Sequence, residues 1–180
     1  MKSIEEMTQG ELAAFVQSHL VKKGIMVVLS GGSSVSFYSS NEYVSMDLDL
    51  VNAGFAKRRA IREVMQTIGF HEEGRHFLHP DTQFFVEFPP GPLSVGKEPV
   101  KQIDEHKLET GILRIISPTD CVKDRLANYY HFNDRQCLYQ AALVVQRNPV
   151  KLEEVERWSE AEGMLDEYLR IKDQLLGQEP

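Results

Sequence analysis

Two stretches in the first half of the chain repeat apolar residues at helical spacing. Residues 8–23 place them three and four positions apart, behind a Thr8-x-x-Glu11 capping box and ahead of Gly24. Residues 56–68 repeat the same spacing. A capping box pairs the first free N–H groups of a helix, and glycine is common just after its end. We therefore predict an amphipathic helix over each stretch.

Apolar runs around these helices predict strands. Residues 25–29 form a continuous run with β-branched side chains, and residues 44–51 include alternating acidic and apolar side chains. A turn at residues 79–82 separates two further runs, residues 75–78 and 83–88. This arrangement predicts a β-hairpin.

The segments between these strands are shorter and less regular. Residues 33–39 predict a short helix directly after a strand. The Pro- and Gly-rich residues 89–99 predict a loop at the rim of the sheet. Residues 97–103 and 111–116 are expected to add short edge strands.

The pattern changes at Ser117. Ser117-Pro118 combines a helix N-cap with a proline at the first helical position, and the periodicity beyond it is helical. Helices are predicted to about residue 131, over 134–147 and over 150–176, with a break at Gly163. The chain is therefore expected to divide into an α/β part, residues 1–116, and a helical part, residues 117–180.

Composition narrows the class of protein. The chain has 180 residues and a net charge of −7, which argues against a broad nucleic-acid-binding face. It holds no apolar run of the ~18 residues that a membrane span needs and no secretory signal pattern. Cys121 and Cys137 fit no metal or redox spacing, and the histidines show no zinc geometry. We expect a cytoplasmic protein with reduced cysteines and no membrane partner.

An acidic pair lies in the second predicted strand. Asp47 and Asp49 are two positions apart, which puts both carboxylates on one face, about 6–7 Å apart at the backbone. Like charges at that distance repel, and a divalent cation such as Mg²⁺ or Mn²⁺ relieves the repulsion. Glu87 is the candidate third acid, because a lone carboxylate among phenylalanines needs a partner. The alternative is that these acids simply face solvent.

The glycine pair Gly31-Gly32 precedes the acids. A strand that ends there and opens a helix presents free backbone N–H groups to an anion, and the Ser33 or Ser34 hydroxyl can add a hydrogen bond. Glycines also commonly do no more than end a strand. Combined with the acids, the spacing predicts a phosphate cradle beside a metal site.

In this order, Gly31-Gly32-Ser33, Asp47-x-Asp49 and Glu87 resemble the DNA polymerase β-like nucleotidyltransferase superfamily. Its pattern is an apolar residue, a glycine, a glycine or serine, then acid-x-acid and a third acid on a later strand. The match covers roughly residues 25–88. The resemblance implies an α+β fold, with a nucleotidyltransferase-like mixed sheet flanked by helices and followed by an all-helical C-terminal part.

Within the superfamily, the chain is most similar to the minimal and the abortive-infection type bacterial nucleotidyltransferases. This resemblance implies that Lys123 and Asp134 lie near the nucleotide, with Arg125 and Arg135 beside them. The chain departs from the familiar Lys-Asp-x-x-Asp pattern, because it has only Asn133-Asp134-Arg135-Gln136 at that place.

The function implied by the resemblance is transfer of NMP from an NTP to a hydroxyl group of a protein, a small molecule or an RNA such as a tRNA end. Asp47, Asp49 and Glu87 would hold Mg²⁺ or Mn²⁺ and carry the catalysis with Lys123. The nucleotide would be bound by Gly31, Gly32, Ser33, Ser34 and Asp134. The charge balance favours a protein or small-molecule acceptor over RNA.

Two other classes of function are compatible with the same residues. The first is a catalytically silent nucleotidyltransferase fold that acts as a nucleotide-binding protein or as a toxin–antitoxin partner. The second is an ordinary α+β interaction domain whose acids are surface residues. Magnesium-dependent NTP binding separates the second from the first and from the enzyme.

Overall fold

The computed structural model describes residues 2–178, so residues 1 and 179–180, at the outer ends of the two predicted parts, lie outside it. The described helices are η1 Ile4–Glu6, α1 Gln9–Val21, α2 Gly31–Tyr38, α3 Arg58–Thr67, α4 Pro118–Phe132, α5 Arg135–Arg147, α6 Leu152–Ala161 and α7 Leu165–Leu175. The described strands are β1 Val28–Ser30, β2 Asp47–Val51, β3 His71–Glu73, β4 His76–Leu78, β5 Phe85–Glu87, β6 Ser94–Val95, β7 Glu98–Pro99, β8 Ile103–Leu108 and β9 Gly111–Ile116.

The described residues form a seven-stranded sheet of order β3-β4-β5-β2-β1-β9-β8 and a separate β6–β7 hairpin. Strand β1 pairs antiparallel with β2 and parallel with β9, and β2 pairs parallel with β5, so the main sheet is mixed. On β2 the buried Leu48 and Leu50 alternate with Asp47 and Asp49. One face of this strand therefore supplies core, and the other presents acids.

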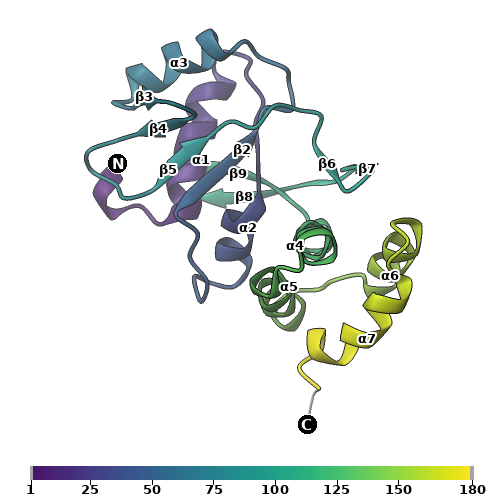
Figure 1. Ribbon diagram of the computed structural model, residues 1–180. Helices are drawn as coiled ribbons and strands as arrows, with labels where there is room; N and C mark the ends of the chain where they lie inside the picture. The colour runs from purple at the N-terminus through teal and green to yellow at the C-terminus, as the bar shows by residue number, and fades with distance from the viewer. Residues whose placement is uncertain (1, 179–180) are drawn as a thin grey trace.

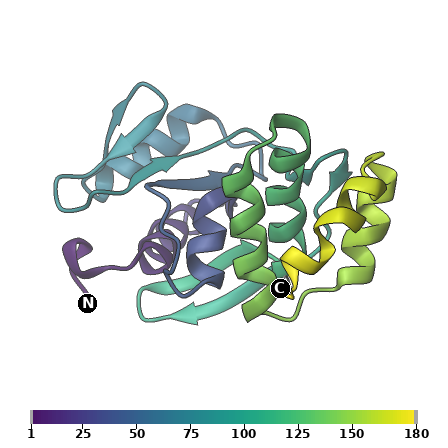
Figure 2. The same cartoon turned by 60° about the horizontal axis from the view of Figure 1, so that its bottom comes forward.

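The α-helices other than α3 form a row beside and across the sheet, and α3 lies near β3 (Figure 1). From left to right in Figure 2 they run α1, α2, α5, α4 and then the α6–α7 pair. The last four helices lie together on the side of α2 away from α1 (Figure 1). This arrangement confirms the predicted α+β class with an all-helical C-terminal part.

Local signals in the sequence produced the helix ends. Thr8 caps α1, with its Oγ1 accepting from the Glu11 N–H at 3.4 Å while the Glu11 carboxylate accepts from the Thr8 N–H at 2.8 Å. Ser117 caps α4 by accepting from the Asp120 N–H at 3.1 Å. Gly163 adopts φ +77° between α6 and α7, where a residue with a side chain would be strained. The corresponding predictions are confirmed.

Several strand predictions were wrong in detail. Strand β9 is an interior strand between β1 and β8, and β8 covers residues 103–108 instead of 97–103. The predicted loop at 89–99 contains the β6–β7 hairpin, and β3 was not foreseen. Gly31 and Gly32 open α2 instead of ending the strand. The interior place of β9 depends on its parallel pairing with the distant β1, which local periodicity does not report.

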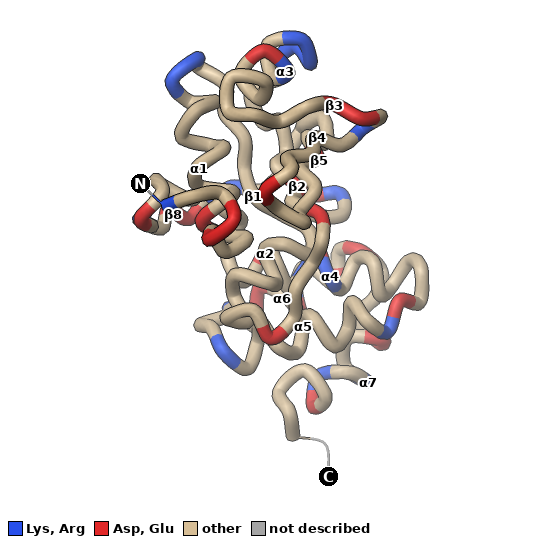
Figure 3. Tube along the Cα trace, turned by 90° about the vertical axis from the view of Figure 1, so that its left-hand side faces the viewer, with Lys and Arg blue, Asp and Glu red and all other residues tan. Residues whose placement is uncertain are grey.

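Charged residues are scattered over the described trace. Figure 3 shows Lys and Arg in short groups that alternate with Asp and Glu, without a continuous basic stripe over residues 2–178. None of the described helices is long and apolar enough to cross a membrane.

Candidate active site

The three predicted acids meet on neighbouring strands. In the parallel register of β2 and β5, Asp47 lies opposite Phe85 and Asp49 lies opposite Glu87. In the antiparallel register of β1 and β2, Ser30 lies opposite Asp49. The N-terminal end of α2, which begins at the next residue, is therefore held beside the acids.

His76 joins this group. It lies opposite Glu87 in the β4–β5 register, and its Nε2 is 2.5 Å from Glu87 Oε1. Arg75 Nε is 3.1 Å from the same oxygen. One ligand atom each from Asp47, His76 and Glu87 lie within 4.8 Å of one another. From the sequence, His76 and Arg75 were basic candidates that could reach phosphate or a base, and the place of His76 beside Glu87 depends on the hairpin register.

Asp49 is a largely buried member of the acidic group. Its burial, together with the charges of Glu87 and Asp47, raises the pKa of its carboxyl group from 3.8 to about 6, and nearby Arg125 opposes the rise. Ionised carboxylates packed this closely are costly without a positive charge between them. Oxygen donors in this number, with an imidazole alongside, suit a hard divalent cation such as Mg²⁺ or Mn²⁺. The residues present thus fit the implied metal.

Gly31 allows the close approach of α2 to the acids. Its φ is +63°, and a Cβ at this position would lie 2.2 Å from Asp49 Oδ2. Ser30, the N-cap residue, makes no side-chain hydrogen bond to the first turn of α2 among the described residues. The backbone N–H groups at this helix end are therefore available to an anion next to the acidic group.

The hydroxyls of Ser33 and Ser34 are engaged within the protein. Ser33 Oγ donates to Ser30 O at 2.9 Å and accepts from the Asp49 N–H at 3.4 Å. Ser34 Oγ donates to Gly31 O at 2.7 Å, and both side chains are buried. They brace the turn that carries Gly31, and the backbone supplies the donors that remain free.

Asp49 borders a cavity of about 250 Å³ between the sheet and α4, which we name the acid cleft. Gly31, Asp49, Asp124 and Arg125 line it together with the segment 89–95. The Arg125 side chain is 12% exposed, is paired with Asp124, and donates to Gln140 Oε1 at 3.3 Å. A fixed guanidinium thus stands across the cleft from a carboxylate group.

Comparison with known proteins finds solved structures of the same fold. No protein-family model matches the sequence, and no curated protein matches it significantly. The solution structure of the antibiotic-resistance factor ANT(2'')-Ia is similar, with a TM-score of 0.54 at 12% identity over 89% of this chain and 92% of that one. A crystal structure of ANT(2'')-Ia in complex with adenylyl-2''-tobramycin gives 0.56 at 14% identity over 86% and 97%. The chain has the nucleotidyltransferase fold. The predicted resemblance to the DNA polymerase β-like superfamily is therefore confirmed for the fold.

Within this nucleotidyltransferase fold, the structure does not bring Lys123 to the acids. Its Nζ donates to Glu154 Oε1 at 2.7 Å and lies 3.6 Å from Asp120 Oδ1, in a cavity on another side of α4. Successive helical residues are about 100° apart, so Lys123 and Arg125 point in directions about 200° apart. On α4 it is Arg125, and not Lys123, that lines the acid cleft.

Asp134 has a structural partner of its own. Its side chain accepts from the backbone N–H groups of Gln136 at 2.9 Å and Cys137 at 3.4 Å, which makes it the N-cap of α5. The structure does not include it among the residues that line the acid cleft. The departure from the Lys-Asp-x-x-Asp pattern noted in the sequence agrees with this placement.

Proposed function

We propose that this protein is a metal-dependent nucleotidyltransferase that transfers NMP from an NTP to a hydroxyl group of a small-molecule acceptor. The observation that carries the proposal is the convergence of Asp47, Asp49 and Glu87 at the uncapped N-terminal end of α2. The adenylyl-2''-tobramycin complex of a protein with the same fold supports a small acceptor. The scattered basic residues favour it over RNA.

The chain's own residues account for binding and orientation. The free N–H groups at Gly31 and Gly32 would bind phosphate oxygens, and Arg125 would bind the pyrophosphate as it leaves. Asp47, Asp49 and Glu87, with His76 beside them, would hold the divalent cation, which when bound neutralises phosphate charge and makes the acceptor hydroxyl more acidic.

The transfer itself breaks a phosphoanhydride bond of the NTP and forms a phosphoester bond to the acceptor. The acceptor oxygen forms a bond to the α-phosphorus while the bond from that phosphorus to pyrophosphate breaks. A carboxylate of the acidic group takes the proton from the acceptor hydroxyl. Arg125 lines the acid cleft together with Asp49, and there it would stabilise the negative charge that grows on the leaving group.

Transfer of label tests the proposal. Each of the four α-labelled NTPs is incubated with the protein, Mg²⁺ and a small-molecule extract, together with a panel of polyhydroxylated amines. We expect a labelled product with at least one NTP and its loss by about a hundredfold or more in Asp47→Asn/Asp49→Asn. Asp81→Asn, which removes an exposed carboxylate, is the matched control and should keep activity.

Two outcomes contradict the proposal. If label transfer survives the Asp47→Asn/Asp49→Asn substitution, these two acids take no part in the reaction. Magnesium-dependent NTP binding without transfer to any acceptor supports the catalytically silent alternative instead.

A further inference from the structure

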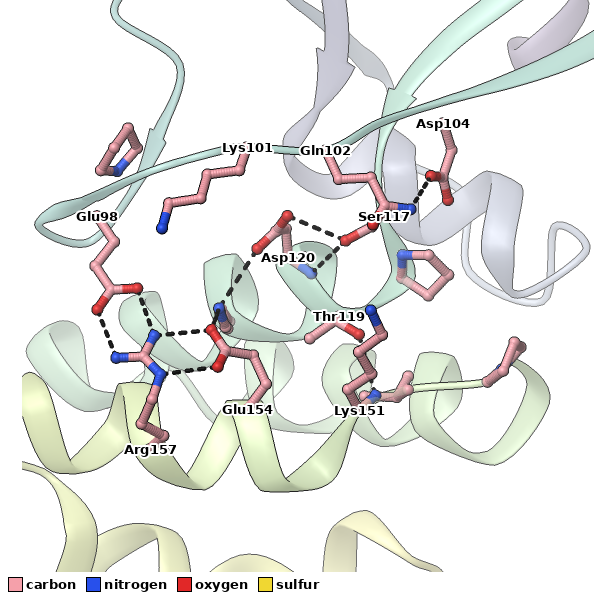
Figure 4. Close-up of a pocket in the computed structure, with 15 residues that line it drawn as sticks. Glu98, Lys101, Gln102, Asp104, Ser117, Thr119, Asp120, Lys151, Glu154 and Arg157 are labelled. Carbon is pink, nitrogen blue, oxygen red and sulfur yellow. Dashed lines mark hydrogen bonds and ion pairs between the residues drawn. The ribbon is translucent and has the colours of Figure 1, made fainter.

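A second cavity, of about 610 Å³, lies on another side of α4. Figure 4 shows that its walls come from the segment 98–104, from the start of α4 and from the segment 149–157. We name it the α4–α6 cavity. Its volume is within the range of sites for small ligands.

A continuous chain of ionic contacts covers one wall of this cavity. Arg157 donates to Glu98 at 2.9 and 2.7 Å and to Glu154 at 2.8 Å with two of its nitrogens. Glu154 also accepts from Lys123 at 2.7 Å, and Lys123 lies 3.6 Å from Asp120. The dashed lines of Figure 4 trace this chain across the cavity.

The carboxylates of the cavity all have donors from the protein. Ser117 Oγ donates to Asp120 at 3.0 Å, and Gln102 Nε2 donates to Asp104 at 2.8 Å. Arg157 and Lys123 serve Glu98 and Glu154, as described above. The acidic groups of this wall therefore need no further positive charge from a ligand.

The basic groups are not all paired. The ammonium groups of Lys101 and Lys151 make no hydrogen bond or ion pair with any described residue, although both side chains line the cavity. In Figure 4 the Lys101 side chain extends into the space near Glu98 and Asp120, and Lys151 rises beside Thr119. The Thr119 Oγ1 accepts from the Lys151 N–H at 3.1 Å, which leaves its hydroxyl proton free to donate.

The charged groups of the cavity that have no partner among the described residues are thus the two lysine ammonium groups. Lys101 and Lys151, fifty positions apart in the sequence, reach the cavity from different sides, with the Thr119 hydroxyl beside Lys151, in a chain whose net charge is −7 (Figure 4). Ammonium groups bind phosphate strongly as point charges, and a dianion can accept from several donors together.

We propose that the α4–α6 cavity binds a small organic dianion, with a phosphate monoester as the best-fitting group. Lys101 and Lys151 bind its oxygens, and the Thr119 hydroxyl donates a further hydrogen bond. The site is separate from the acid cleft, because the residues that line the two cavities differ. It does not depend on the proposed transfer reaction.

Calorimetric titration of the full chain in EDTA tests this site. The probes are glycerol 3-phosphate, inorganic phosphate and citrate, which separate a phosphate ester from free phosphate and from a polycarboxylate. We expect saturable binding, tightest for glycerol 3-phosphate, that weakens about tenfold or more in Lys101→Gln/Lys151→Gln. Both lysines are exposed, so the variant should fold normally. Trp158, the only tryptophan and the neighbour of Arg157, gives a second readout by fluorescence.

Matched variants decide the outcome. Lys22→Gln/Lys107→Gln removes the same charge at two exposed positions outside the cavity and should bind as the wild type does. Asp47→Asn/Asp49→Asn should also bind normally. Equal weakening in both lysine doubles would mean a general charge effect and would overturn the site. Failure of all three probes to bind saturably overturns it as well, and tighter binding of citrate than of glycerol 3-phosphate overturns the phosphate assignment.

Discussion

Asp49→Asn should make the metal-free protein more stable at neutral pH although it removes a residue of the candidate active site. The pKa of the Asp49 carboxyl group is raised from 3.8 to about 6, first by burial and then by Glu87 and Asp47. One pKa unit corresponds to about 1.4 kcal/mol. Keeping Asp49 ionised therefore costs the folded chain up to about 3 kcal/mol, which asparagine does not incur.

The sign of the pH dependence follows from the number of protons that Asp49 binds in the folded and in the unfolded chain. Between pH 3.8 and about 6 the folded chain holds a proton on Asp49 that the unfolded chain has released. The free energy of unfolding contributed by this group therefore falls as the pH rises through that window, and it stays lower above it. Asp49→Asn should match the wild type below this window and exceed it by up to about 3 kcal/mol above pH 7.

Chemical denaturation in EDTA at a series of pH values measures the effect. For a chain of this size each kcal/mol corresponds to about 2–4 °C in Tm, so thermal unfolding gives an independent reading. Asp81→Asn, at an exposed carboxylate, should show no such gain. Addition of Mg²⁺ should stabilise the wild type more than Asp49→Asn. A variant that is less stable than the wild type at pH 7.5, or a gain that does not change with pH, refutes the reasoning.

Four further substitutions test other contacts. Gly31→Ala should lower the free energy of unfolding by at least about 1–2 kcal/mol and weaken NTP binding in calorimetry, because the φ of this residue is +63° and the added Cβ would meet Asp49. Unchanged affinity for NTP would contradict phosphate binding at this end of α2. Arg125→Gln should raise the half-saturating NTP concentration about tenfold in the transfer assay, whereas Lys123→Gln should leave it unchanged. If Lys123→Gln raises that concentration and Arg125→Gln does not, Lys123 is the residue that binds the nucleotide. Ser117→Ala should cost about 1 kcal/mol in urea denaturation through loss of the α4 cap, with activity retained.

The parts of the fold that local chemistry decides could be predicted from sequence. The capping interactions of Thr8 and Ser117 and the break at Gly163 involve residues within a few positions of one another. The position of β9 inside the sheet depends on its parallel pairing with β1, some eighty residues earlier. No periodicity in either segment contains that information, so an interior strand was predicted as an edge.

Part of the candidate site, too, could be predicted from local sequence, and part depends on strand pairing. The order of glycines and acids predicted the resemblance, and the registers of β1, β2 and β5 bring those residues together. His76 was a candidate only for contact with phosphate or a base, because its place in the acidic group depends on the hairpin register with Glu87. Arg125 was noted but not chosen, because the expected place of a lysine on α4 does not reveal which side of the helix meets the cleft.

Over most of its length, helix α4 has no face that is exposed to solvent. From Pro118 to Tyr130 every residue is buried or half-buried, because two cavities and the neighbouring helices surround it. A surface helix tolerates substitution on the face that points to water, with a repeat of 3.6 residues. In a saturation mutagenesis map, α4 should instead be intolerant at nearly every position, as a helix that crosses the interior of a larger protein would be.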